Sequence, residues 1–265
     1  MNAAGVKKPV AKTEDEIELI RQSSLLVGKT LAELASWIKP GVTTLELDRI
    51  ADEFIRDHGA YPGFNGYRGY PNSICASVNS AVVHGVPGSA PLKEGDVVSI
   101  DIGVVKDGFW GDSAYTFAVG EVKPDVRRLL EVTLECLDLA VEQAVAGKRL
   151  GDIGFAVQSH AEAHGYGVVR ELVGHGLGRN LHEPPEVANY GKRGTGLVLH
   201  EGWVIAIEPM INLGSRHVRE MEDGWTIRTR DDRPSAHYEH TLVIRKEQAE
   251  VLSTFKWIHE ALASK

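Results

Sequence analysis

The alternation of apolar and polar residues predicts that the first half of the chain forms helices followed by strands. A capping box at Thr13–Glu16 precedes an apolar pattern with helical spacing that continues to Trp37. Thr43 begins a second pattern of this kind, which ends near Gly59. After a loop rich in glycine, proline and aromatic residues, Ser73–Asn79 has the composition of a strand.

The second half repeats this order. A long amphipathic helix is predicted over about residues 125–146, and Asp152 is predicted to cap another helix that ends near Gly165. Short strand patterns dominate after Gly167, namely VVRELV, WVIAIEPM, WTIRTR and HYEHTLVI. Helices that feed strands in both halves predict an α+β fold, in which helices cover a curved, largely antiparallel sheet.

Val97–Phe117 is predicted to form a β-hairpin that turns at Asp107-Gly108, a dipeptide that favours a two-residue loop. With this loop, Asp112 falls opposite Gly103 and lies diagonally from Asp101 on the same face, with the side chains about 7 Å apart or less. Gly103 has no side chain, which leaves room beside Asp112. Two carboxylates so close in apolar surroundings are destabilising unless a cation lies between them. The hairpin therefore predicts a metal site, although a three-residue loop would break the register.

Composition and charge narrow the class of protein. The chain has 265 residues, of which 43% are hydrophobic and 25% charged, as in globular proteins. Its formal net charge of −8 argues against a protein that coats nucleic acid. Two cysteines give no disulfide framework, and neither a membrane-spanning run nor a signal-like N-terminus is present. We expect a soluble cytoplasmic protein without a membrane partner, with residues 1–12 as a flexible tail.

Three further residues extend the candidate metal site. By strand alternation Glu208 shares a face with the apolar side chains before it, Glu239 shares one with those after it, and His175 lies between glycines that permit close approach. Taken alone, each has a structural explanation. Together with Asp101 and Asp112 they make four carboxylates and one imidazole, which two divalent ions of Mn, Fe, Co or Zn would neutralise. Two such ions about 3.5–4 Å apart can share a water, lower its pKa and polarise a carbonyl.

Six motifs follow one another along the chain: SICASVNSAVVHGVP (73–87), DIGVVKDGFWGD (101–112), VGHGLGRNLHEPP (173–185), IEPM (207–210), MEDGWTIRTRD (221–231) and SAHYEHTLVI (235–244). In this order and at this spacing, they make the chain resemble the type I methionine aminopeptidases of bacterial type. The resemblance extends over about residues 14–253. It implies the pita-bread (creatinase-like) fold, with halves related by pseudo-twofold symmetry, and a single catalytic metallopeptidase domain over residues 13–265.

The resemblance also implies roles for the candidate metal ligands. In the family pattern Asp112 and Glu239 bridge two metal ions, Asp101 completes one ion, and His175 with Glu208 completes the other. All five positions hold the required residue type. Glu208 is implied to move a proton from the bridging water to the leaving amine.

Further residues are implied to contact the substrate. His84 would lie near the scissile amide, and His182 would hydrogen-bond the substrate carbonyl or the developing oxyanion; without the resemblance we would consider both structural. The methionine side chain would lie among Tyr67, Tyr70, Cys75, Leu181 and Trp225. Two positions depart from the family pattern: Leu181 replaces a usual aromatic residue, and Phe64 stands where cysteine is frequent. His237 and His240 match no required position, and we expect them to be structural.

The implied reaction is removal of the N-terminal methionine from nascent proteins whose second residue is small, by attack of metal-activated water. The family pattern implies a cytoplasmic monomer whose substrates are met at the ribosome exit. Two alternatives remain open at this point. One is a related metallopeptidase of the same fold that cleaves Xaa-Pro bonds, and the other is a non-catalytic binding module that has kept the fold.

Overall fold

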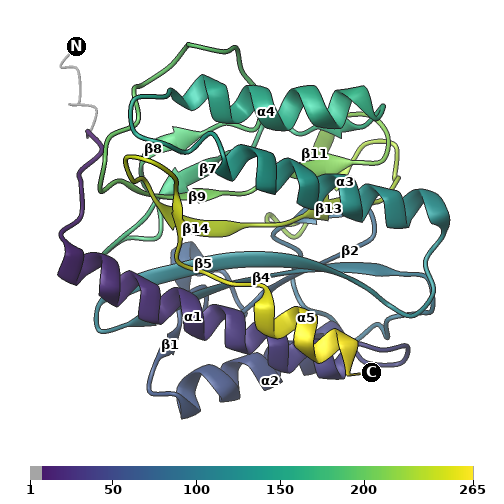
Figure 1. Cartoon of the computed structure of the whole chain (residues 1–265). Coiled ribbons are helices and arrows are strands. Elements are labelled where there is room, and N and C mark those ends of the chain that lie inside the picture. The colour runs from purple at the N-terminus through teal and green to yellow at the C-terminus, as the bar shows by residue number, and fades with distance from the viewer. Residues whose placement is uncertain (1–7, 265) are drawn as a thin grey trace.

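The computed structural model describes residues 8–264 as two layers of helices on either side of antiparallel β-sheets (Figure 1). On one face α1 packs against β4 and β5, alongside α2 and α5; on the other face α3 and α4 pack together. None of these helices is long and apolar enough to cross a membrane. The helices are α1 (Glu14–Trp37), α2 (Thr44–Asp57), α3 (Pro124–Val141), α4 (Leu150–Ala163) and α5 (Lys256–Ala263), with a short 3₁₀ turn at Tyr67–Gly69.

The strands form four small sheets, and every pairing between named strands is antiparallel. In the first half, β1 (Tyr61–Pro62), β4 (Val97–Lys106) and β2 (Cys75–Val78) pair in that order, and β5 (Phe109–Ala118) also pairs with β4. In the second half, the order is β15 (Glu250–Val251), β14 (His240–Val243), β9 (Val204–Ile207), β7 (Gly174–Gly176) and β8 (Glu183–Val187). One three-stranded sheet has the order β13 (Ser235–His237), β10 (Met210–Asn212) and β6 (Gly167–Val168). The other has the order β11 (Val218–Glu220), β12 (Ile227–Thr229) and β3 (Ala81–Val83).

The helix starts follow from local hydrogen bonds, with one correction. At α1, the Thr13 hydroxyl accepts from the Glu16 N–H and the Glu16 carboxylate accepts from the Thr13 N–H, so the predicted capping box is confirmed. Asp152, however, is not the residue that caps α4. It lies one turn inside the helix, where its carboxylate accepts from the N–H groups of Arg149 and Gly194. From the third position of the helix, the Asp152 carboxylate thus satisfies the backbone N–H of Arg149, the residue immediately before the helix.

The predicted hairpin register is confirmed: Lys106 pairs with Phe109, and Gly103 pairs with Asp112. Asp107 and Gly108 have φ angles of 49° and 77°, the left-handed values that a two-residue turn requires. The predicted room beside Gly103 is not free. A β-carbon there would lie 2.5 Å from Cε1 of Phe64, so an aromatic ring fills the space that we expected beside Asp112.

The strand patterns WVIAIEPM and HYEHTLVI were predicted as continuous strands, and this prediction is wrong. The first divides into β9 and β10, and the second divides into β13 and β14, with Glu208 and Glu239 in the breaks. Pro209 lacks the N–H that a continuing ladder needs. Because His240 pairs with Ile207, both glutamates leave their strands at the same end of the sheet. The predicted strand VVRELV is also shorter, since only its first residue belongs to β6.

The N-terminal segment lies partly within the described residues. Its residues 1–7 lie outside them. The Lys12 N–H donates to the Gly202 carbonyl, and the Lys12 ammonium donates to Oε2 of Glu183 at 2.6 Å.

Gly111 allows α1 to approach the hairpin closely, and we expect Gly111→Ala to destabilise the fold. A β-carbon at this position would overlap backbone atoms of Ser23 and Ser24, which cannot rotate away. We expect a loss of about 1–3 kcal/mol in the free energy of unfolding, measured by urea denaturation. Gly88→Ala is the matched control, because a β-carbon at residue 88 meets nothing within 4 Å. Equal tolerance of both substitutions would contradict the close approach.

Candidate active site

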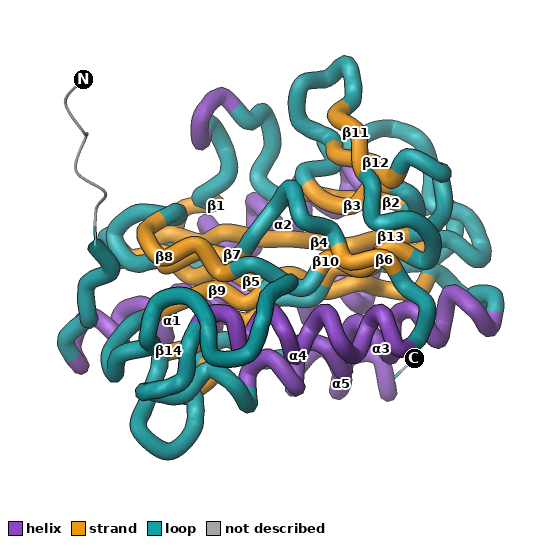
Figure 2. Tube along the Cα trace, turned by 90° about the horizontal axis from the view of Figure 1, so that it is seen from above, coloured by secondary structure: helices purple, strands orange, loops and turns teal. Residues whose placement is uncertain are grey.

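All of the predicted site residues line one cavity of about 300 Å³. The loop after β1 and the β11–β12 hairpin project from the same side of the sheets and flank the cavity (Figure 2). These residues are Tyr67, Tyr70, Cys75, His84, Asp101, Asp112, His175, Leu181, His182, Glu208, Trp225 and Glu239. Residues far apart in the sequence are thus brought to one place, as the motifs predicted.

The floor of the cavity carries the carboxylates and one imidazole. Asp101 lies on β4, Asp112 on β5 and His175 on β7, while Glu208 and Glu239 lie in the two strand breaks. One ligand atom each of Asp112, His175 and Glu239 lies within 4.8 Å of the others. Nε2 of His175 is 3.7 Å from Oδ2 of Asp112 and 3.7 Å from Oε1 of Glu208. The five side chains therefore form one cluster.

Burial raises the pKa of every carboxyl group in this cluster. It raises the pKa of Asp101 to about 7, with repulsion by Glu208 adding to the shift, and the pKa of Glu208 to about 8. The pKa values of Asp112 and Glu239 are also raised, first by burial and then by the neighbouring acids. Without a cation, the cluster thus holds protons near neutral pH.

Three oxygens of the cluster are buried without a hydrogen-bond partner among residues 8–264: Oδ1 of Asp101, Oδ1 of Asp112 and Oε1 of Glu239. Asp112 and Glu239 are only 3% and 2% exposed. A buried carboxylate oxygen without a donor is costly, whereas a divalent ion would satisfy it. The donor set therefore fits metal binding.

Nδ1 of His175 lies 3.0 Å from the Gly176 carbonyl oxygen. Since that carbonyl can only accept, Nδ1 carries the proton and the lone pair of Nε2 points toward the carboxylates. Burial lowers the pKa of His175 to about 3, so the ring is neutral. Gly174 permits this arrangement, because a β-carbon there would overlap the Ala206 carbonyl. His175 is thus prepared as a ligand by its neighbours.

Two further histidines border the cluster. His84 has a left-handed backbone with φ of 57°, a strained conformation for a residue with a side chain. Burial lowers its pKa to about 4. His182 has an exposed outer edge, but desolvation of its inner side and the Arg68 cation lower its pKa to about 4. The Tyr67 hydroxyl lies 2.9 Å from Nδ1 of His182. Both rings are therefore neutral at pH 7.

An apolar pocket opens onto the cluster. Phe64, Tyr70, Cys75 and Leu181 form one buried group, and Trp225 packs against it. The Tyr70 hydroxyl donates to the carbonyls of Ile74 and Gly85, which fixes its ring edge-on to Trp225 with centroids 5.1 Å apart. The two residues that depart from the family pattern, Phe64 and Leu181, thus belong to the same pocket. The Phe64 ring supplies an aromatic group to the pocket that has Leu181 in place of the usual aromatic residue.

The chain also matches a known peptidase family over most of its length. The sequence pattern described as metallopeptidase family M24 matches residues 18–246. The chain belongs to this family.

Individual M24 relatives are similar to it over nearly their whole length. The methionine aminopeptidase of Clostridium perfringens is 48% identical over 247 residues, which is 93% of this chain and 99% of that protein. The crystal structure of the methionine aminopeptidase from Rickettsia prowazekii has a TM-score of 0.91 at 42% identity and covers 93% of this chain and 100% of that one. The predicted resemblance, the pita-bread α+β fold and the class of metallo-aminopeptidase are thereby confirmed.

A second kind of protein shares the fold. The Xaa-Pro dipeptidase from Bacillus anthracis gives a TM-score of 0.75 at 23% identity, and the match covers 93% of this chain but 62% of that one. At such identity the likeness shows the fold alone. The M24 assignment and the oxygen-rich, partly unsatisfied ligand set together support divalent metal binding by this chain.

The structure places His237, which we expected to be structural, beside the cluster. His237 is only 1% exposed, and its Nε2 lies 3.6 Å from Oε2 of Glu208. Neither ring nitrogen has a hydrogen-bond partner among the described residues. In the sequence, the position of His237 two residues before the candidate ligand Glu239 was the feature that could have indicated its place at the site. His240 is structural as expected, since Nδ1 contacts the Ser253 hydroxyl and the ring stacks on Phe255.

Proposed function

We propose that this M24 enzyme removes the N-terminal methionine from polypeptides whose second residue is small, at a site with two divalent metal ions. One observation carries the proposal: an apolar pocket with aromatic rings and a sulfur opens directly onto a cluster of buried carboxylates. An unbranched thioether packs favourably against aromatic rings, at about 0.3–1.5 kcal/mol for each contact. The relatives that are more than 40% identical and are named above, from Clostridium perfringens and Rickettsia prowazekii, are methionine aminopeptidases, which supports the same reaction.

The metal ions would be held by Asp101, Asp112, His175, Glu208 and Glu239, with Asp112 and Glu239 between them. When bound, they would polarise the first carbonyl of the substrate and lower the pKa of a water shared between them. The ligand set suits Co, Mn, Fe or Zn, and availability decides among these ions.

The protein groups position the substrate and move the proton. Neutral His182 can donate an N–H to the carbonyl oxygen, where negative charge develops in the transition state. Tyr67 lies at the other ring nitrogen and fixes the orientation of His182. His84 also lines the cavity, where it would lie near the amide nitrogen that becomes the leaving amine. Burial raises the pKa of Glu208, which suits it to accept a proton and then release it to that amine.

The proposal is tested by comparing the release of methionine from Met-Ala peptides with the cleavage of Ala-Pro peptides. Our assignment expects Met-Ala peptides to have the higher kcat/KM by at least about tenfold, since the apolar pocket accommodates methionine and discriminates by its fit. A preference for Ala-Pro peptides would favour the Xaa-Pro peptidase alternative instead.

His182→Ala is expected to lower kcat by about 10²-fold with a smaller change in KM, because it removes a donor used mainly in the transition state. Initial rates on a Met-Ala peptide measure the effect. His217→Ala is the control, because His217 is exposed and does not line the cavity. If His182→Ala raises KM alone, its role is in substrate binding rather than in stabilising the transition state.

We further propose that residues 13–265 form one catalytic domain that acts as a cytoplasmic monomer on nascent chains at the ribosome exit. The monomer is supported by the presence of the whole residue set in one chain. Light scattering after gel filtration tests it, and a stable dimer would contradict it.

A further inference from the structure

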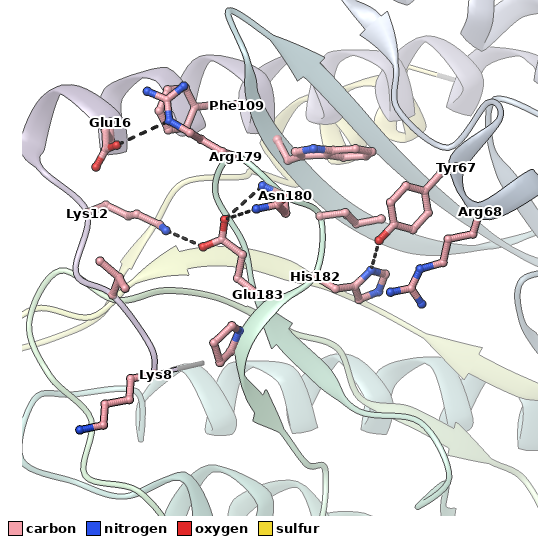
Figure 3. A pocket seen from close by; sticks show the side chains of 14 residues that line it. Lys8, Lys12, Glu16, Tyr67, Arg68, Phe109, Arg179, Asn180, His182 and Glu183 are labelled. Carbon is pink, nitrogen blue, oxygen red and sulfur yellow. Dashed lines mark hydrogen bonds and ion pairs between the residues drawn. The ribbon is translucent and has the colours of Figure 1, made fainter. Parts of the chain in front are cut away.

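A second hollow, which we call the outer groove, adjoins the active-site cavity. It has a volume of about 580 Å³ and shares Tyr67, Arg68, Leu181 and His182 with the cavity. Figure 3 shows it between the N-terminal segment with Lys12, the loop with Arg179 and Asn180, and the Tyr67-Arg68 loop. Because His182 lines both hollows, the outer groove offers a path for the rest of a peptide whose first amide lies at the carboxylate cluster.

The lining of the outer groove is cationic, although the whole chain carries a net charge of −8. Four of its side chains are basic and two are acidic, which gives a local charge of +2. The basic residues are Lys8, Lys12, Arg68 and Arg179, and the acidic ones are Glu16 and Glu183.

The basic side chains of the outer groove differ in how closely an acidic side chain pairs with them. Lys12 forms a 2.6 Å ion pair with Glu183, whereas Arg179 lies 4.0 Å from Glu16 and holds its guanidinium over the Phe109 ring at 4.3 Å. The Arg179 side chain is 66% exposed. Arg179 is therefore available to another anion.

Arg68 has no acidic partner at all within residues 8–264: no carboxylate oxygen lies within 4.0 Å of its guanidinium, which instead sits 5.4 Å from the Tyr67 ring centroid. Its backbone has a φ of 50°, and the turn around it is closed by hydrogen bonds from the Tyr67 N–H to Phe64 and from the Gly66 N–H to Tyr70. An unpaired cation is thus held at the mouth of the cavity in a strained backbone conformation.

A third hollow of about 860 Å³ also adjoins the cavity at His182. It shares Lys8, Arg68 and Glu183 with the outer groove, but it is also lined by Glu186 and lacks Lys12 and Arg179. Its charged side chains cancel, because Lys8 and Arg68 balance the two glutamates. The outer groove is therefore the more cationic of the two exits, with a lining charge of +2 against none.

We propose that the outer groove binds the substrate chain beyond its second residue and that Arg68 and Arg179 select acidic side chains there. The inference rests on the proposed function, since it concerns the same peptide substrate. Nascent chains with Asp or Glu among their third to sixth residues are then processed faster than chains with Lys at those positions. The attraction acts between exposed charges, so it weakens as salt screens them.

The test uses the metal-loaded enzyme and Met-Ala peptides with Asp, Ala or Lys at each position from three to six. At low salt, kcat/KM for the Asp peptide exceeds that for the Lys peptide by about threefold to tenfold at one or more positions, as exposed charge pairs allow. Raising the salt concentration to about 1 M, where the Debye length is about 3 Å, removes most of this difference.

Two substitutions locate the effect. Arg68→Gln and Arg179→Gln each reduce the Asp-over-Lys ratio by at least about half. Glu186→Gln, in the third hollow, leaves the ratio unchanged. Arg49→Gln is a control for loss of a surface cation, because Arg49 is exposed on α2 and pairs with Glu53.

The outcomes separate the two proposals. Equal rates for Asp and Lys peptides at every position overturn the groove inference and leave the proposed function standing. A ratio that changes in Glu186→Gln and not in Arg179→Gln also overturns it, because the chain then leaves through the third hollow. Failure to release methionine from any peptide refutes the proposed function itself.

Discussion

Asp112→Asn is expected to abolish peptidase activity, with a fall in kcat/KM of at least about 10³-fold. A ligand atom of Asp112 lies within 4.8 Å of those of His175 and Glu239, and under the proposed function Asp112 would contact both metal ions. An uncharged amide would replace neither the charge nor the second oxygen of the carboxylate. Initial rates on a Met-Ala peptide measure the loss of activity, and the metal content of the purified protein measures the loss of bound metal.

The same substitution is expected to stabilise the metal-free protein. It removes one buried acid whose pKa is raised by burial and by repulsion from Asp101, so the remaining acids repel each other less. Urea denaturation in the presence of a chelator measures this. Asp57→Asn is the matched control, because Asp57 is exposed at the end of α2 and should change neither activity nor stability. Peptidase activity that survives Asp112→Asn would contradict the role of this carboxylate at the metal site.

Removal of metal is expected to inactivate the enzyme completely and to make its stability fall as the pH rises. In the unfolded chain the carboxyl groups have pKa values of about 4, whereas folding raises those of Asp101 and Glu208 to about 7 and about 8. Stabilisation by a raised carboxyl pKa is fully present below about pH 4 and is lost as the pH passes the folded value.

The clearest window is pH 6.5–8.5. Below pH 6.5, two buried histidines make stability fall as the pH is lowered, which opposes the effect of the carboxyl groups. Folding lowers the pKa of His175 to about 3 and that of His84 to about 4, whereas histidine in the unfolded chain takes up a proton at about pH 6.5. Within the window, the free energy of unfolding should fall by about 1.4 kcal/mol per pH unit for each proton that the native cluster retains. Urea titrations at several pH values check this.

Added divalent metal is expected to reverse this dependence. The ions replace the retained protons, so binding releases protons and the holoenzyme becomes more stable toward pH 8.5. Calorimetry in two buffers of different ionisation enthalpy measures the proton release. A metal-free protein whose stability is constant across this window would contradict the raised pKa values of the cluster.

The hairpin was the most predictable part of the fold and of the site. A two-residue turn and a period of two are local properties, so Asp107-Gly108 was enough to fix Gly103 opposite Asp112. The first two helices were predictable for the same reason, since their caps at Thr13 and Thr43 use only neighbouring residues. The five candidate ligands were found from residue type and spacing together with the resemblance to a family.

Tertiary contacts decided what the sequence left open. The strand break at Glu239 depends on β14 meeting the hairpin, where the Glu239 N–H donates to the Ala114 carbonyl instead of to a ladder partner. The space beside Gly103 belongs to Phe64, a residue 39 positions earlier that no local pattern connects to it. Neither outcome follows from periodicity, because each is set by atoms distant in sequence.

The same division holds for function. By itself the sequence determined which side chains could bind metal and which could contact methionine, because those choices depend on chemistry and on motifs. Only the tertiary structure decided that His237 lies against Glu208 and that Arg68 faces an exit while lacking an acidic partner within residues 8–264. Burial and the pairing of charges are properties of the packed molecule, since they depend on which distant segments come to lie around a side chain.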